Sequence, residues 1–126
     1  MALTLTNPHP TPTLYHGTSL ANARRLLAHG WAPNTLPSGH NQGRTDRLYA
    51  TTTPDNAAWY ADRHDQGVVL RIDLSDGTPL HLDPEDSSGA TVAEELALPH
   101  GLPGNLTIAT PLPASAFTSH PPQDAP

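Results

Sequence analysis

The chain has 126 residues, a formal net charge of −6 and no cysteine, and all six of its basic residues are arginine. This length suits a single domain that buries a core without disulfides or metal. The composition excludes disulfide bonds, thiolate metal sites and a cysteine nucleophile, and the negative charge disfavours, without excluding, unaided binding to nucleic acid.

Proline concentrates at the two ends of the chain. We therefore expect residues 1–10 and 118–126 to be flexible, with one domain over residues 11–117. Residues 1–20 lack the basic start and apolar run of a signal peptide, and no segment is long and apolar enough to span a bilayer. These features predict a soluble, cytoplasmic protein without a membrane partner.

The first third of the chain predicts a strand, a helix and a loop. Residues 11–16 favour extended backbone, and Ser19 is a good N-cap for a helix that ends at Gly30. Residues 31–46 contain proline, glycine, asparagine and serine without a periodic pattern, which indicates a loop that could close on a ligand.

A second strand and a second helix follow. Residues 47–52 predict the strand, and Thr53 and Pro54 predict the N-cap and first turn of a helix that runs to about Arg63. Within this helix, Trp59 is interpreted as a core residue.

The second half of the chain is richer in strands. Residues 68–74 alternate between apolar and polar types, and further strands are expected over residues 78–82 and 105–110. Residues 90–96 fit either a short helix or a loop. A parallel doubly wound sheet would need more crossovers, so we expect an α+β domain with small packed sheets.

Several residues at the expected strand ends could line a cleft between two sheets. His16 and Tyr49 offer an imidazole and a flat ring, and Thr18 adds a hydroxyl. Gly17 would let a ligand approach the main chain closely, and Asp83 follows a strand end, where functional loops gather. These residues by themselves do not name a reaction.

Four segments carry a family resemblance: Tyr15-His16-Gly17-Thr18, Leu48-Tyr49-Ala50-Thr51, Asp55-Asn56-Ala57-Ala58-Trp59 and Asp83-Pro84. They resemble the ADP-ribosyltransferase fold of the diphtheria-toxin type, and most closely the small bacterial rifamycin ADP-ribosyltransferases. The resemblance implies a split β-sheet core with a few short helices. It also implies a mono-ADP-ribosyltransferase that uses NAD as co-substrate, with a rifamycin-like small molecule as the leading acceptor.

The resemblance also implies roles for individual residues. His16 would bind the adenosine ribose, and the main chain of Gly17 would bind the nicotinamide amide. Tyr49 would stack on the nicotinamide ring. Asp83 would hold the nicotinamide-side ribose and stabilise the oxocarbenium-like centre that forms when nicotinamide leaves, without any metal. The acid stays open between Asp83 and Glu95, because the segment around Glu95 resembles the glutamate strand of the His-Tyr-Glu branch.

Other residues are expected at the same cleft. Thr18, Thr51 and Tyr60 would line it. The guanidinium groups of Arg44 and Arg47 suit a pyrophosphate, although two solvated loop charges are the alternative interpretation. The histidines lack metal-ligand spacing, so no metal site is expected.

Three further hypotheses stay open. The first is a toxin of a toxin–antitoxin pair, with an antitoxin protein as partner, that ADP-ribosylates nucleic acid or protein or hydrolyses NAD. The second is an RNA 2′-phosphotransferase, which should carry more basic residues than this chain. The third is an inactive module that binds NAD or ADP-ribose.

Overall fold

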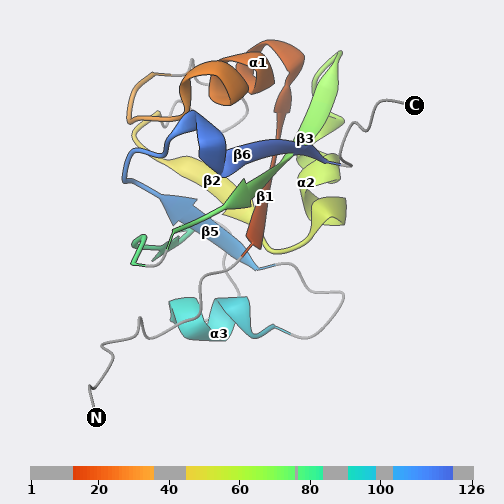
Figure 1. Ribbon diagram of the computed structural model, residues 1–126. Coiled ribbons are helices and arrows are strands. Elements are labelled where there is room, and N and C mark those ends of the chain that lie inside the picture. The colour runs from red at the N-terminus through yellow and green to blue at the C-terminus, as the bar shows by residue number, and fades with distance from the viewer. Residues whose placement is uncertain (1–12, 36–44, 76, 84–90, 99–103, 121–126) are drawn as a thin grey trace.

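The computed structural model describes residues 13–35, 45–75, 77–83, 91–98 and 104–120. In chain order its elements are β1 (Thr13–Ser19), α1 (Leu20–His29), β2 (Leu48–Thr51), α2 (Pro54–Ala61), β3 (Gly67–Asp73), β4 (His81–Leu82), α3 (Val92–Leu96), β5 (Asn105–Ile108), the 3₁₀ helix η1 (Ala114–Ala116) and β6 (Phe117–His120) (Figure 1). The α+β class expected from the sequence is confirmed, but the strands form one sheet and not the small packed sheets that were expected.

One antiparallel sheet of six strands runs through the described residues in the order β4-β5-β2-β1-β3-β6. Its strands are joined unequally. β1 pairs with β3 along its whole length, from Thr13 to Ser19, but it shares a single residue pair with β2, Tyr15 with Thr51. β2 in turn pairs with β5 along its whole length. The sheet therefore consists of two well-paired halves, β1–β3–β6 and β2–β5–β4, that meet at one narrow junction.

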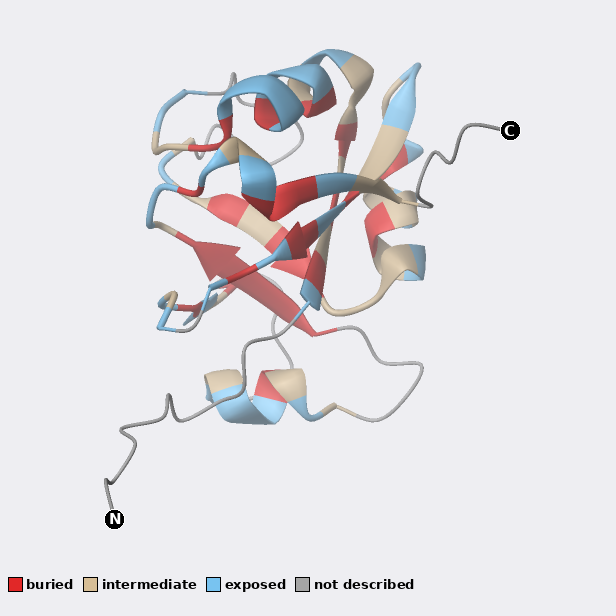
Figure 2. Cartoon of the chain, viewed as in Figure 1, coloured by how far each residue is buried: buried red, intermediate tan, exposed pale blue. Residues whose placement is uncertain are grey.

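The apolar core lies on one face of this sheet and continues across both halves. Its largest fully buried apolar side chains are Leu14, Leu26, Leu48, Leu70, Ile72, Leu106 and Ile108. Because side chains alternate along a strand, these positions lie on one face, and α1 covers them through Ala23 and Leu26. Burial of one such side chain stabilises the fold by roughly 1.5–3 kcal/mol, so this face holds the two halves together. Figure 2 shows buried residues on strands of both halves.

The helix α2 packs against β1 and β3 without intervening side chains. A Cβ atom on Gly17 would collide with the Ala57 carbonyl oxygen and would lie 2.8 Å from the Ala61 nitrogen. A Cβ atom on Gly67 would collide with the Ala61 carbonyl oxygen in the same way. The first role of Gly17 is thus to let a helix backbone rest on the strand.

The helix ends predicted from the sequence are confirmed. Ser19 Oγ accepts a hydrogen bond from Asn22 N at 3.2 Å, and Thr53 Oγ1 accepts one from Asn56 N at 3.2 Å. Gly30 closes α1 with φ of 76°, a conformation that favours glycine. Residues 92–96, within a segment that fitted either a helix or a loop, form α3.

Two expectations about single segments were also wrong. Residues 118–120, expected in a flexible terminus, belong to β6, because Phe117 is only 3 % exposed and fixes this strand against the core. Trp59, interpreted as a core residue, is 53 % exposed, because Ala57 and Ala61 occupy the side of α2 that meets the sheet.

Other expectations fall on residues outside the described part of the chain. These are residues 1–12, residues 121–126 and most of the loop over 31–46, whose closure on a ligand stays a prediction. None of the helices in the described segments has the length and apolar character needed to cross a membrane.

Candidate functional site

The junction between β1 and β2 brings two of the expected site residues together. His16 Nδ1 lies 2.6 Å from the carbonyl oxygen of Tyr49. This side-chain contact crosses from β1 to β2 next to the only residue pair that joins the two strands. The imidazole thus bridges the halves of the sheet where the backbone ladder stops.

This contact fixes the protonation of His16. A carbonyl oxygen only accepts, so Nδ1 carries a proton and donates it to Tyr49. Burial lowers the pKa of His16 below the ordinary value of 6.5, and the nearby His64 lowers it further, while the bond to Tyr49 raises it in part. The ring is therefore neutral at pH 7, and Nε2 carries a lone pair suited to accept a hydrogen bond from a hydroxyl group.

The main chain of Gly17 also faces the junction. The carbonyl group of Tyr49 points toward β1, and peptide groups alternate in direction along a strand. Thr51, two residues after Tyr49, therefore points its peptide groups toward β1 at the pair with Tyr15. By the same alternation, Gly17 directs its N–H and C=O toward β2, beyond the end of the ladder.

The side chains around the junction divide between the two faces of the sheet. The pairing of Tyr15 with Thr51 puts Tyr49, Thr51 and Gly17 on one face. His16 and Thr18 belong to the opposite face, and both are buried. The His16 imidazole therefore contacts the backbone carbonyl group of Tyr49, whereas the Tyr49 phenol ring lies on the other face of the sheet.

A buried polar cluster covers the face of β2 and β5 that carries Tyr49. Asn56, in the first turn of α2, donates from Nδ2 to Thr51 Oγ1 and to Asn105 Oδ1, both at 3.0 Å. Thr51, Asn105 and Thr107 are all buried. Neither Asn56 nor Asn105 is recognisable as a site residue from the sequence, because an asparagine near a helix start or a strand start has a local explanation in capping and turns.

Both candidate acids reach this cluster through the main chain of Asn105. Glu95 Oε2 accepts a hydrogen bond from Asn105 N at 2.7 Å, and Asp83 N donates to Asn105 O at 3.3 Å. Glu95 has no exposed surface, and Asp83 is 7 % exposed. A Glu95 carboxylate oxygen therefore links α3 to the start of β5, whereas Asp83 contacts Asn105 through its backbone nitrogen.

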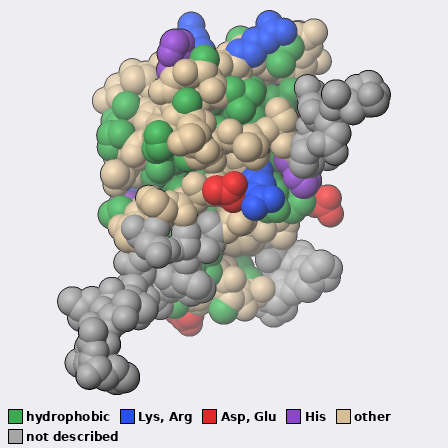
Figure 3. All heavy atoms as spheres, in the orientation of Figure 1, with side chains coloured by type: hydrophobic (Ala, Val, Ile, Leu, Met, Phe, Trp, Pro, Cys, Tyr) green, Lys and Arg blue, Asp and Glu red, His purple; other side chains and the backbone are tan. Residues whose placement is uncertain are grey.

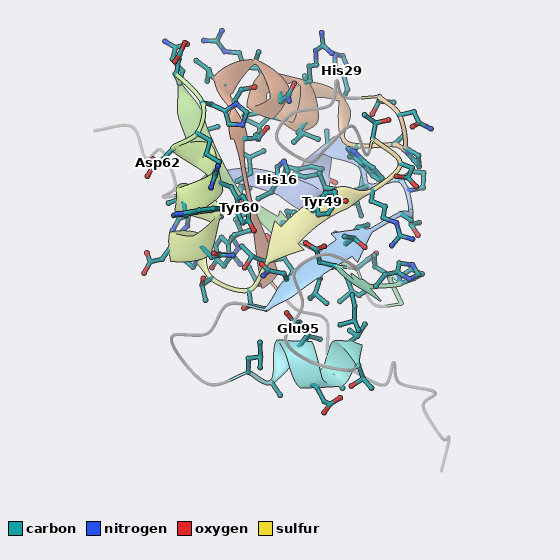
Figure 4. All side chains as sticks on the ribbon, turned by 180° about the vertical axis from the view of Figure 1, so that it is seen from behind. His16, His29, Tyr49, Tyr60, Asp62 and Glu95 are labelled. Carbon is teal, nitrogen blue, oxygen red and sulfur yellow. The ribbon has the colours of Figure 1, made fainter. Side chains whose placement is uncertain are left out.

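Two more expected residues border the junction. Tyr60 lies one helical turn after Asn56, on the same side of α2, and Figure 4 shows it in the same region as His16 and Tyr49. Arg47 precedes Tyr49 by two residues and donates from Nη1 to Thr107 Oγ1 at 3.1 Å. Figure 4 places Glu95 away from these residues, at α3.

A separate groove lies elsewhere on the molecule. It has a volume of about 640 Å³ and is bordered by α1, α2 and the paired ends of β3 and β6, including Leu20, Leu27, Ala58, Val69 and His120. None of the expected site residues lines it. It is therefore distinct from the junction of β1 and β2.

Charged groups do not form a continuous basic surface on the face that Figure 3 presents. The arginine side chains, in blue, stand mainly at the α1 end of this face. The ion pair between Arg71 and Asp73, at 3.0 Å, joins two exposed side chains of β3. Among the described residues, no three histidine, aspartate or glutamate side chains gather closely enough to hold a metal ion.

The arrangement draws on three separate strands and one helix. His16 comes from β1, Tyr49 from β2, Asp83 from the end of β4, and Tyr60 from α2. Such a site could bind a ligand with hydroxyl groups, an amide and a ring at the junction of the two half-sheets. No protein-family model, no curated protein and no solved structure matches this chain, so the function is argued from these residues.

Proposed function

We propose that the protein is an NAD-dependent mono-ADP-ribosyltransferase whose dinucleotide binds at the junction of β1 and β2. The observation that carries the proposal is the contact from His16 Nδ1 to the Tyr49 carbonyl group. It leaves Nε2 as an acceptor for a ribose hydroxyl. A protonated imidazole would instead present a second donor.

The nicotinamide end fits the main chain of Gly17. A primary amide both donates and accepts, and Gly17 directs one acceptor and one donor toward the gap beyond Tyr15. Tyr49, from β2, and Tyr60, from α2, supply aromatic rings in the same region. The glycine-to-helix contact closes the Cα side of Gly17, so a ligand would have to use its peptide groups.

The chemical step breaks the bond between ribose C1′ and the nicotinamide nitrogen. Nicotinamide leaves with the bonding electron pair, and a positive charge develops on the ribose. A nucleophilic atom of the acceptor then bonds to C1′, and the proton of that atom is released. A carboxylate aimed at the developing charge lowers the barrier by electrostatic stabilisation.

We assign this carboxylate to Asp83. Glu95 already uses an oxygen to hold the N–H of Asn105. Asp83 meets Asn105 through its backbone nitrogen. Because the preceding Leu82 pairs with Leu106 on the apolar face, alternation puts the Asp83 side chain on the polar face that carries Tyr49. A rifamycin-like small molecule is the acceptor that the family resemblance suggests.

Release of nicotinamide from NAD⁺ tests the proposal. Asp83→Asn should lower the rate about 100- to 1000-fold, because it removes the negative charge and keeps the shape of the side chain. Glu95→Gln serves as the matched control and should keep most of the activity, since its amide oxygen can still accept from Asn105 N. Equal rates in the wild type and Asp83→Asn would remove Asp83 from the reaction, and no release by the wild type would reject the transferase.

The acceptor needs its own measurement. Wild-type protein, NAD⁺ and rifampicin are incubated together, and the molecular mass of the antibiotic is measured by mass spectrometry. The proposal expects the added mass of one ADP-ribose. Nicotinamide release without any change in the antibiotic would retain the NAD chemistry and exclude this acceptor.

A further inference from the structure

We propose that Arg47 and Thr107 form a binding site for a phosphate group, next to Tyr49 on the polar face of β2 and β5. The site deepens the proposed function, because it names the part of a nucleotide that this face would bind. It rests on contacts that do not depend on any catalytic activity.

The guanidinium group of Arg47 is held in place, but no acid among the described residues serves as its counterion. Nη1 donates to Thr107 Oγ1 at 3.1 Å, and Thr107 is fully buried. Nε is also buried, and it has no hydrogen-bond partner among the described residues. Within that part of the chain, no carboxylate forms an ion pair with Arg47. A half-buried cation in this condition is unfavourable unless an anion completes it.

The unused atoms have the geometry that a phosphate needs. In a guanidinium group, Nε–H and one N–H of Nη2 point in the same direction and form a fork. Because Thr107 binds Nη1, this fork is not used by that contact. Two parallel N–H groups match two oxygens of a phosphate, and the pair of bonds is stronger than the contact of a single charge.

The position of the site links it to the junction. Tyr49 pairs directly with Thr107 across β2 and β5, and Arg47 lies two residues before Tyr49 on the same face. The guanidinium group therefore lies on the β5 side of Tyr49, and Gly17 lies on its β1 side. A nucleotide that places a ring at Tyr49 would bring its phosphate to Arg47.

Equilibrium binding tests the site without turnover. Inorganic pyrophosphate, ADP-ribose and adenosine are titrated separately into the wild-type protein and into two variants, Arg47→Gln and Arg25→Gln. Arg25 is an exposed arginine of α1, so its variant serves as the matched control. We expect Arg47→Gln to bind pyrophosphate and ADP-ribose about tenfold more weakly, with adenosine unchanged. Arg25→Gln should behave as the wild type.

A second measurement uses the unmodified protein, which guards against a variant that fails to fold. The arginine Nε–H signals are followed by ¹⁵N NMR, and Arg47→Lys identifies the signal of Arg47 by its loss. Pyrophosphate should change the chemical shift of this signal at lower concentrations than it needs to change the signals of the other arginines. No movement, or equal binding by the wild type and Arg47→Gln, would overturn the phosphate site.

The two sources of phosphate give different results. Binding of both pyrophosphate and ADP-ribose through Arg47 supports the site as the pyrophosphate contact of the dinucleotide. Binding of pyrophosphate alone through Arg47 supports the site but contradicts the use of NAD. Binding that is independent of Arg47, together with nicotinamide release, would reject the site and retain the proposed function.

Discussion

The two sides of β1 are joined to the rest of the sheet in very different ways. On one side β3 pairs with it from Thr13 to Ser19, and on the other side β2 pairs with it only at Tyr15. A continuous ladder satisfies its own peptide groups, so the β3 side needs no further explanation. On the β2 side, His16 supplies a side-chain bond where the ladder stops.

The faces of β2 and β5 differ in a similar way. One face carries the apolar core, and the other buries Thr51, Asn105 and Thr107. Burial of a polar group is unfavourable unless the group is hydrogen-bonded, so a polar layer stabilises a small domain less than an apolar layer does. The apolar face therefore stabilises the fold, and this contrast supports our proposal that the polar face and the junction bind a ligand.

The largest expected effect is on the well-paired side of β1. Gly17→Ala places a methyl group against the backbone of α2 at Ala57 and Ala61, which cannot move aside as a side chain would. We expect a loss of about 3 kcal/mol in the free energy of unfolding, measured by urea denaturation. Both stability and nicotinamide release should fall together.

A second glycine gives the control for this change. Gly77 has φ of 88°, and apart from its chain neighbours no described residue comes within 4 Å of an added Cβ. Gly77→Ala should therefore cost only the backbone strain, about 1 kcal/mol. If Gly17→Ala cost no more than Gly77→Ala, the direct contact between α2 and β1 would be absent.

The second effect concerns the polar face. Glu95→Ala removes the acceptor of the buried Asn105 N–H, and we expect a loss of about 2 kcal/mol in the free energy of unfolding. Glu95→Gln keeps an oxygen at this place and should lose clearly less. The comparison is made by chemical denaturation. Equal losses in the two variants would mean that the hydrogen bond to Asn105 does not stabilise the fold.

Local signals in the sequence predicted much of this fold. Ser19, Thr53 and Gly30 mark helix ends through their own side chains or backbone freedom, and these ends were predicted correctly. The strand over residues 68–74 was visible because its alternation reports one buried face. Such features depend on residues close together in the chain.

Features that depend on distant partners were predicted poorly. The edge strand β6 has a short polar sequence, and only its pairing with β3 and the burial of Phe117 make it a strand. Trp59 was misplaced because an aromatic residue in a helix fits a core equally well in the sequence. At the candidate site, the residue types of His16 and Tyr49 were recognisable from the sequence. Asn105 was not, because its contacts come from four separate segments: β2, α2, the end of β4 and α3.

The third effect is a pH dependence of stability from His16. Burial lowers the pKa of His16 in the folded protein, so the unfolded chain binds the proton more strongly. The free energy of unfolding should therefore fall as the pH drops below the ordinary value of 6.5, and this loss should be absent above it. The slope from one group does not exceed about 1.4 kcal/mol per pH unit.

His16→Asn isolates this contribution. Its amide can still donate to the Tyr49 carbonyl group but does not titrate. Denaturation curves of both proteins are compared from about pH 7.5 to about pH 5.5, and the wild type should lose more stability toward acid. His64→Gln should make the wild-type slope slightly shallower, because it removes the charge that faces His16. Parallel curves for the wild type and His16→Asn would contradict a lowered pKa.

The smallest effect is on the outer surface of α2, away from both sides of β1. The Arg63 guanidinium carbon lies 3.8 Å from the centre of the Trp59 ring, and Trp59 is 53 % exposed. A double-mutant cycle of Trp59→Ala and Arg63→Gln should give a coupling of about 0.5 kcal/mol, measured by chemical denaturation. A buried tryptophan would instead cost about 3–5 kcal/mol on truncation to alanine. If Trp59→Ala lowers the free energy of unfolding by that much, other parts of the chain cover α2. A small loss means that the Trp59 ring is exposed and stabilises the fold only weakly.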